Sequence, residues 1–383
     1  MSMASEQAAR ARRLANTSLG YYNLMAGPTA WRFTSAMGLE WNDNIRLTGI
    51  DPLSDLIFRP EVDARMLWPM TEKNALNLRV GAGYSAYVAN PGYSRFYVRP
   101  GSEISFDLYS GNLTFNLHDR FSILEDAYQD PTIVGNGDYS RLENALGLST
   151  LWDLNKIIAR AGYDHISYVS LNNNQRVPDG ESDIFYGSAG YRLGDIGIAG
   201  LELGGGLINY KTVAQNDATQ WNAGAFAESQ FSDYISLRAS AGYMVYSPDQ
   251  VGSASAGDFS GVYFQVAARH LVNEHLSYDL SAGRSVNFAF YGGSVASWFI
   301  RWTGNWKVLR KMSLNTSVDY QRGEELQFAR EQFDWIGGGF SLGKQLTRKL
   351  FASGGYRVYV RNSNLASRDY IVNTVSLQFT YAF

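Results

Sequence analysis

The chain contains no cysteine, which excludes disulfide bonds, thiol catalysis and zinc sites with cysteine ligands. It has only 9 prolines in 383 residues, so little interrupts its extended runs. No stretch approaches the roughly 18 consecutive apolar residues that a membrane-spanning helix needs, which excludes helical spans. The formal net charge of -3 lacks the basic excess expected of a nucleic-acid-binding protein.

The abundant residues are those that form strands and turns. The sequence has 38 Gly, 25 Tyr, 20 Phe and 9 Trp, and little of it beyond residue 30 has helical periodicity. No linker, charge run or low-complexity segment divides it, so we predict one large unit. The mean hydropathy of -0.23 is that of a soluble protein. A barrel whose apolar and polar residues alternate gives such an average as well.

Alternating runs recur with a period of roughly twenty residues and amount to about eighteen strands. In the clearest run, Leu56 to Trp68, the apolar residues share one face and four charged residues share the other. Turning this strand over would place these charges against lipid, at up to about 2–4 kcal/mol for each arginine near the midplane. The runs reach about ten to fourteen residues, which exceeds a typical sandwich strand and suits a tilted membrane strand.

The connections between the runs alternate in length. Short links such as 110–112, 153–156 and 308–311 alternate with longer polar stretches such as 122–141 and 170–182. Outer-membrane barrels combine tight periplasmic turns with longer extracellular loops in this way.

The last nine residues, Val375 to Phe383 (VSLQFTYAF), place Phe379, Tyr381 and Phe383 on one face of a strand. They resemble the C-terminal assembly signal of bacterial outer-membrane β-barrels, which the barrel-assembly machinery recognises. We therefore predict an all-β fold: a single transmembrane antiparallel up-and-down β-barrel of about 18 strands, with short periplasmic turns and longer extracellular loops. An even strand number that starts in the periplasm returns the C-terminus there, so we expect a bacterial outer-membrane protein with a periplasmic C-terminus.

The barrel is predicted over residues 29–383. Residues 1–28 contain Arg10, Arg12 and Arg13 but no apolar core or small-residue cleavage site behind them, so they do not read as a secretory signal. We expect a mature chain whose segment 1–28 lies in the periplasm or in the lumen, or is disordered.

A barrel of about 18 strands is too wide for its interior side chains to fill, so a lumen is expected. Two interpretations of its charged lining stay open: a wall of structural ion pairs, or a selectivity lining in which arginine rings favour anions and acidic rings favour cations. The residues predicted to line the pore are Arg59, Glu61, Asp63, Arg65, Arg79, Arg99, Glu103, Asp107, Arg120, Arg160, Asp164, Arg238, Asp279, Arg301, Asp319 and Arg357.

Catalytic and metal-binding motifs are weak. The segment HLVNEH, His270 to His275, lacks the HExxH spacing that places two metal ligands on one helical face. His165 follows Asp164 on a strand, so their side chains point to opposite faces and form no dyad. We predict no catalytic residue, no metal site and no cofactor, and therefore no enzyme.

The segment Met37 to Ile45 (MGLEWNDNI) looks like the start of the beta-barrel porin family often found with exopolysaccharide gene clusters. This resemblance implies a passive or secretion-coupled channel, with a polysaccharide as one candidate cargo. We predict a porin-like channel for small hydrophilic solutes or ions. The alternatives are a barrel associated with polysaccharide export, a structural or surface scaffold plugged by the loop 122–141 or by the N-terminal segment, and an embedded hydrolase with an aligned Ser, His and acid at the outer rim.

The partners expected of such a protein are outer-membrane lipid and lipopolysaccharide, the barrel-assembly machinery and, as an open alternative, further copies of the same chain. No nucleic acid is expected.

Overall fold

The computed structural model describes residues 22–123, 127–135, 140–171, 179–194, 197–211, 217–249, 258–288, 294–326 and 331–383. These residues are almost entirely β-strand, with short 3-10 turns at η2 (Pro91–Tyr93), η3 (Ala127–Gln129) and η4 (Ala366–Arg368). Within this part of the chain, no helix is both long and apolar enough to cross a membrane.

The strands follow one another in chain order around a single sheet. Their bounds are β1 (Leu24–Ala26), β2 (Thr29–Asn42), β3 (Asp55–Thr71), β4 (Asn74–Tyr87), β5 (Arg95–Ser110), β6 (Leu113–Ile123), β7 (Arg141–Asp153), β8 (Ile157–Ser170), β9 (Gly180–Leu193), β10 (Gly197–Tyr210), β11 (Ala218–Gln230), β12 (Ile235–Pro248), β13 (Phe259–Leu271), β14 (Leu276–Phe288), β15 (Ser294–Leu309), β16 (Met312–Glu325), β17 (Gln332–Gln345), β18 (Leu350–Ser363) and β19 (Tyr370–Ala382).

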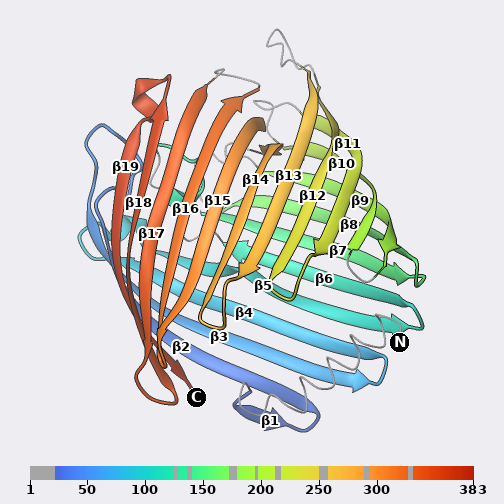
Figure 1. The fold of residues 1–383 in the computed structure, drawn as a ribbon. Coiled ribbons are helices and arrows are strands. Elements are labelled where there is room, and N and C mark those ends of the chain that lie inside the picture. The colour runs from blue at the N-terminus through green and yellow to red at the C-terminus, as the bar shows by residue number, and fades with distance from the viewer. Residues whose placement is uncertain are drawn as a thin grey trace.

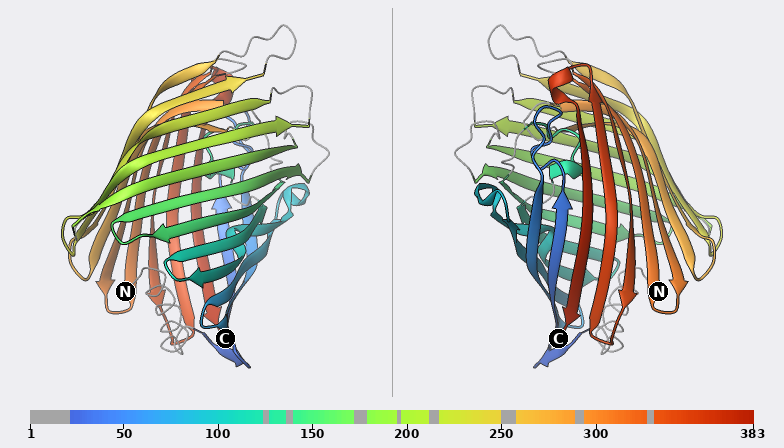
Figure 2. Two further views of the ribbon diagram at one scale, coloured as in Figure 1. Left: turned by 90° about the vertical axis from the view of Figure 1, so that its right-hand side faces the viewer. Right: turned by 90° about the vertical axis from the view of Figure 1, so that its left-hand side faces the viewer.

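The sheet closes on itself as a barrel (Figure 1). Each strand from β2 to β19 pairs antiparallel with the next, and β19 pairs with β2, from Thr374 opposite Asn42 to Ala382 opposite Thr34. The short β1 forms a hairpin with the start of β2. The ring therefore has 18 strands, and the predicted all-β antiparallel barrel is confirmed. Its strands are strongly tilted, so the near and far walls cross in the side views (Figure 2).

Tight turns gather at one end of the barrel, together with the C-terminus (Figure 1). Between β5 and β6 the turn is Gly111–Asn112, where Gly111 has a φ of +58°, a left-handed conformation that glycine adopts without strain. We call this the short-turn end and the opposite one the long-loop end. β1 extends the sheet into the predicted N-terminal segment, and residues 1–21 lie outside the described residues.

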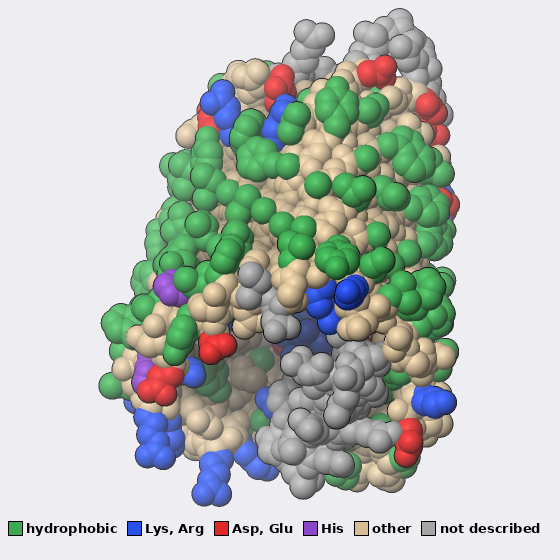
Figure 3. Space-filling model, turned by 45° about the vertical axis from the view of Figure 1, so that its right-hand side comes forward, with side chains coloured by type: hydrophobic (Ala, Val, Ile, Leu, Met, Phe, Trp, Pro, Cys, Tyr) green, Lys and Arg blue, Asp and Glu red, His purple; other side chains and the backbone are tan. Residues whose placement is uncertain are grey.

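Hydrophobic side chains cover the outer wall, and charged side chains gather toward its two ends (Figure 3). Met37 on β2 is 63% exposed and Val62 on β3 is 62% exposed, whereas Glu40 on the other face of β2 is 6% exposed. The predicted alternation therefore sorts apolar residues outward and polar residues inward, as a barrel surrounded by lipid requires.

Candidate channel interior

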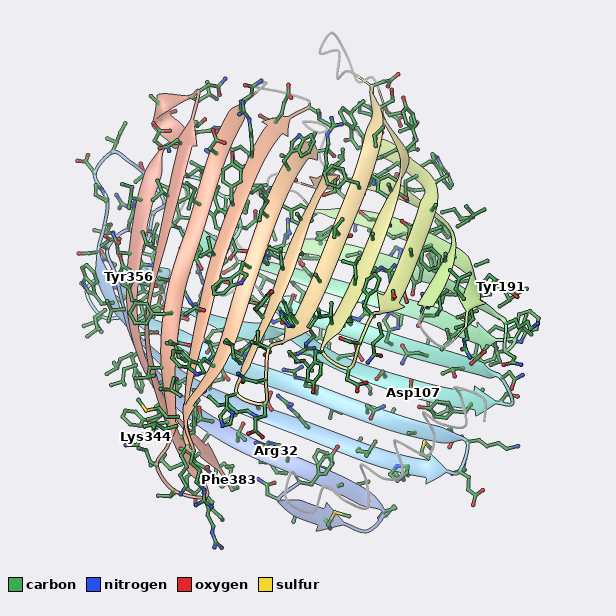
Figure 4. The ribbon with its side chains drawn as sticks, in the orientation of Figure 1. Arg32, Asp107, Tyr191, Lys344, Tyr356 and Phe383 are labelled. Atoms are coloured by element: carbon green, nitrogen blue, oxygen red, sulfur yellow. The ribbon has the colours of Figure 1, made fainter. Side chains whose placement is uncertain are left out.

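All the charged residues predicted to line a lumen lie on the inner face of the sheet. The register places Arg59 opposite Gly38, Arg79 opposite Glu103, and Arg301 opposite Asp319, always on the face turned away from the exposed apolar side chains. Figure 4 shows Arg32 and Asp107 on the wall that β2–β5 contribute. Whether these residues line a conducting pore stays a prediction.

Most of these charges are paired, within one strand or with a strand one or two positions along the sheet. The pairs that are partly open to solvent each contribute only about 0–1 kcal/mol to stability. Their main effect is to neutralise the wall locally. The pairs are Arg59–Glu40 (3.1 Å), Arg65–Asp63 (3.0 Å), Arg99–Glu61 (2.8 Å), Arg120–Glu103 (2.9 Å), Arg269–Asp279 (3.6 Å) and Arg301–Asp319 (2.5 Å).

Glu228 joins strands that are further apart in the sheet. Glu228 on β11 accepts two hydrogen bonds from Arg160 on β8, at 3.1 and 3.3 Å, although β9 and β10 lie between them. Arg238 on β12 donates to the same carboxylate and lies 3.8 Å from Glu202 on β10. Long side chains can meet across two intervening strands only on the concave face of the sheet, so this cluster confirms that the inner face is the charged one.

A second contact joins β6 and β8 across the intervening β7. His118 on β6 is 2% exposed, and its Nε2 lies 2.7 Å from Asp164 Oδ1 on β8. Gly147 on the intervening β7 leaves the room for this contact, because a Cβ there would lie 2.1 Å from Asp164 Oδ1 and 2.5 Å from His118 Nε2. His118 is thus a satisfied interior residue, and the glycine is required for close approach rather than for its backbone conformation.

The connection between β6 and β7 enters the barrel. Its described residues 127–135, here called the inner loop, contribute Ala127, Tyr128 and Ile133 to a buried apolar cluster with inward residues of β15, β17, β18 and β19. β15 lies nine strands from β6 in either direction around the ring, so the inner loop reaches the opposite wall. In Figure 2 the turquoise η3 lies beside the long-loop ends of β19 and β2.

Both apolar and polar contacts hold the inner loop. The Tyr128 ring packs on Tyr359 of β18 at 5.3 Å, and its hydroxyl donates to Glu40 Oε2 at 3.3 Å. Gly135 N donates to Leu47 O in the connection between β2 and β3. Complete burial of Ile133, at 0% exposure, adds an apolar anchor, of the kind whose truncation costs about 2–5 kcal/mol.

Arg361 on β18 is the polar centre of this contact. It is 1% exposed, its Nε donates to Pro131 O of the inner loop at 2.9 Å, and its Nη1 donates to Glu331 Oε1 at 2.8 Å. Its guanidinium also lies over the Phe333 ring at 4.3 Å. The buried cation therefore has carbonyl and carboxylate acceptors, and the inner loop supplies one of them.

The two acids beside this centre respond to burial in opposite ways. Burial alone would raise the pKa of Glu331, but hydrogen bonds from Arg361, Ser363 and Arg368 outweigh it and hold the pKa below its usual value. In the inner loop, burial raises the pKa of Asp130 even though Thr132 donates hydrogen bonds to it. An ionised Glu331 thus holds Arg361, which in turn donates to Pro131 O of the inner loop.

Two pockets line the inner wall on different sides of the ring. A pocket of about 570 Å³ lies over β2, β3 and β5 with part of β17–β19, and one of about 770 Å³ lies over β8–β15. Arginines outnumber acids in both. The first contains Arg32, Arg59, Arg65, Arg99, Arg357, Glu40, Glu61 and Asp63, and the second contains Arg160, Arg192, Arg238, Arg269, Arg301, Glu228 and Asp279.

Several residues of this interior are not among the predicted lining residues. Glu40, Glu202 and Glu228 have the inward parity of their strands, so the same alternation could have identified them. Arg361 and Glu331 lie at the strand ends next to the long loops, where alternation stops being informative. The residues of the predicted assembly signal, Phe379, Tyr381 and Phe383, are exposed on the outer face, and their recognition by an assembly machine stays a prediction.

No protein-family profile and no curated protein matches the chain. The link to the exopolysaccharide-associated family is therefore not supported. Among solved structures, Acinetobacter baumannii OccAB3 superposes with a TM-score of 0.51 at 12% identity, over 94% of this chain and 100% of that one. Pseudomonas aeruginosa OccK2 (OpdF) in complex with glucuronate gives 0.52 at 12%, over 92% and 98%.

A BenF-like porin from Pseudomonas fluorescens Pf-5 gives a TM-score of 0.50 at 11% identity, over 92% of this chain and 99% of that one. At these identities the similarity concerns the architecture. The chain is a complete closed barrel with the fold of the outer-membrane porins.

Proposed function

We propose that the protein is an outer-membrane channel for the passive passage of small hydrophilic solutes. The observation that carries this proposal is the inner face of the closed ring, whose charged side chains surround two pockets of about 570 and 770 Å³. Both inner pockets are larger than a buried water site, and each is lined by seven or eight charged residues among small and polar ones. Side chains alone cannot fill a ring of this width, so an aqueous lumen is expected.

We propose that the channel has a weak preference for anionic solutes. Most inner arginines are paired, which lowers the field in the lumen, but both pockets contain more arginines than acids. Positive linings favour anions. The solved complex of OccK2, a barrel of the same fold, contains glucuronate, a small organic anion, which agrees with this preference.

The test is current through the purified protein in planar bilayers under a salt gradient. We expect stable conductance and a reversal potential that indicates a modest preference for chloride over potassium. The triple variant R160Q/R238Q/R301Q removes three arginines of one pocket and should shift the reversal potential toward cations. The matched triple variant R310Q/K311Q/R348Q removes three charges outside the lumen and should leave it unchanged. A cation-selective wild type would refute the preference.

A scaffold with a closed lumen is the second candidate, because the inner loop reaches the opposite wall. The scaffold predicts no current from the wild type and current only after the inner loop is released. Conductance of the wild type would exclude it.

For the location we propose the bacterial outer membrane with the short-turn end in the periplasm. The absence of native cysteine allows a single introduced cysteine at Lys73 to be labelled with an impermeant reagent on intact cells. Labelling only after the outer membrane is permeabilised is the expected result.

A further inference from the structure

Basic side chains gather on one arc of the short-turn end. They come from two turns only, β15–β16 and β17–β18, and all are exposed. None forms an ion pair with any residue in the described part of the chain. We call this set the turn arc: Arg310, Lys311, Lys344, Arg348 and Lys349.

The two turns form one surface. Gln345 N donates to Lys311 O at 2.9 Å, and Lys344 lies opposite Met312 in the register of β16 and β17. Neither 306–312 nor 343–351 contains an acidic residue, although the whole chain has a net charge of -3. Other short turns contain acids, such as Asp233 between β11 and β12 and Glu274 between β13 and β14. The positive charge is therefore a local feature of this arc. Figure 3 shows Lys and Arg side chains gathered at the lower end of the molecule.

Exposed apolar side chains lie among these cations. Leu309 is 65% exposed, Trp306 49% and Leu346 45%, and Lys349 Nζ lies 5.9 Å from the centre of the Tyr381 ring. Figure 4 shows Lys344 and Phe383 close to the same end of the barrel. Cations beside exposed apolar and aromatic groups suit the boundary between hydrocarbon and headgroups, where stems lie in the apolar layer and charges reach the water. An acidic soluble partner would account for the charges but not for the exposed Leu309.

We propose that the turn arc binds the headgroups of anionic phospholipids in the leaflet that faces the short turns. This rests on membrane insertion, as in the proposed function, but not on conduction. A basic residue near an anionic membrane surface contributes about fivefold to affinity, equivalent to about 1 kcal/mol. Several cations on two adjacent turns would act on the same small group of lipids, which would produce a fixed annular site.

The experiment compares lipid retention by two matched variants of the full chain. Each protein is reconstituted in vesicles of equal parts phosphatidylglycerol and phosphatidylcholine, then extracted in mild detergent, and the lipids that stay bound are quantified by mass spectrometry. K311Q/R348Q removes two cations from the turn arc. K73Q/K156Q removes two exposed cations from other turns of the same end. Migration of unheated samples on gels confirms that each barrel has folded.

Wild type and K73Q/K156Q should retain phosphatidylglycerol in preference to phosphatidylcholine. K311Q/R348Q should lose this preference by up to about 25-fold, which corresponds to two cations. The wild-type preference should also disappear in 1 M salt, where the screening length is about 3 Å. Equal retention by both variants, or a preference that survives 1 M salt, would overturn the proposal. Current is recorded in parallel, so that lipid preference without conductance would refute the channel and leave the lipid site standing.

Discussion

Replacing Arg361 with methionine tests whether the inner loop is held by the buried guanidinium. Methionine replaces the apolar stem of the side chain but removes every hydrogen bond that the guanidinium donates, including the one to Pro131 O of the inner loop. Hydrogen bonds from charged groups contribute about 1.5–3 kcal/mol. At tenfold for each 1.4 kcal/mol, the inner loop should be undocked about ten to a hundred times more often.

The full cost of the substitution is larger than its effect on the inner loop. Breaking a buried ion pair costs about 3–5 kcal/mol, because the remaining charge is left without its partner. Here Glu331 keeps Arg368 as a second cation, at 2.5 Å, so part of this loss is recovered at the rim of the barrel. The part of the free-energy cost that concerns the inner loop itself is the lost hydrogen bond to Pro131 O.

Two measurements report how often the inner loop is undocked. In planar bilayers, R361M should show a larger mean conductance and more frequent fluctuations than the wild type. A spin label on a cysteine introduced at Gln129, an exposed residue of the inner loop, should become more mobile. The native chain has no cysteine, so this label is unique.

The control is R357M, which removes an exposed inward arginine from the same strand, nearer the short-turn end. It changes the charge of the lumen without touching the contact to Pro131. If R361M and R357M change the current equally, or if the label is equally mobile in R361M and in the wild type, then Arg361 does not hold the inner loop.

Three further changes probe the outer wall, the interior and the rim. Val62→Arg should destabilise the barrel in vesicles by about 2–4 kcal/mol, since Val62 faces outward near the middle of β3, and urea unfolding measures this; a loss under 0.5 kcal/mol would place this face outside the hydrocarbon. Gly147→Ala should separate His118 from Asp164 and cost about 1–3 kcal/mol, whereas an unchanged unfolding midpoint would show that the contact is dispensable. Because the pKa of Glu331 is lowered in the folded protein, its contribution to docking is complete above the ordinary value of 4.5 and is lost as the pH falls through the lowered pKa. Channel fluctuations should therefore increase toward acid pH in the wild type, and Glu331→Gln should abolish this pH dependence; an identical acid response in both proteins would contradict it.

Alternation was sufficient to predict the barrel because one face of each strand is suited to lipid and the other to a polar interior. In β3 the inward set Arg59, Glu61, Asp63 and Arg65 cannot face lipid without a large cost, so parity determines the side on which each residue lies. Closure into a ring of 18 also followed from counting these runs. Even the glycine-rich β9 and β10 form full strands, because their neighbours supply the register that their own sequences specify weakly.

The inner loop could not be predicted in the same way, because its position depends on contacts that no local pattern encodes. Tyr128 and Ile133 read as ordinary loop residues until the ring brings Tyr359 and Val372 of distant strands beneath them. Arg361 lies at a strand end where alternation is uninformative, yet it is buried at 1% exposure while most of the predicted lumen arginines remain partly exposed. The difference arises because the inner loop covers the wall at Arg361 and removes it from solvent. In the proposed channel, the strength of this contact would set how much of the cross-section stays open. This is why the variants at Arg361 and Glu331, rather than those of the exposed ion pairs, should have the largest effects on conductance.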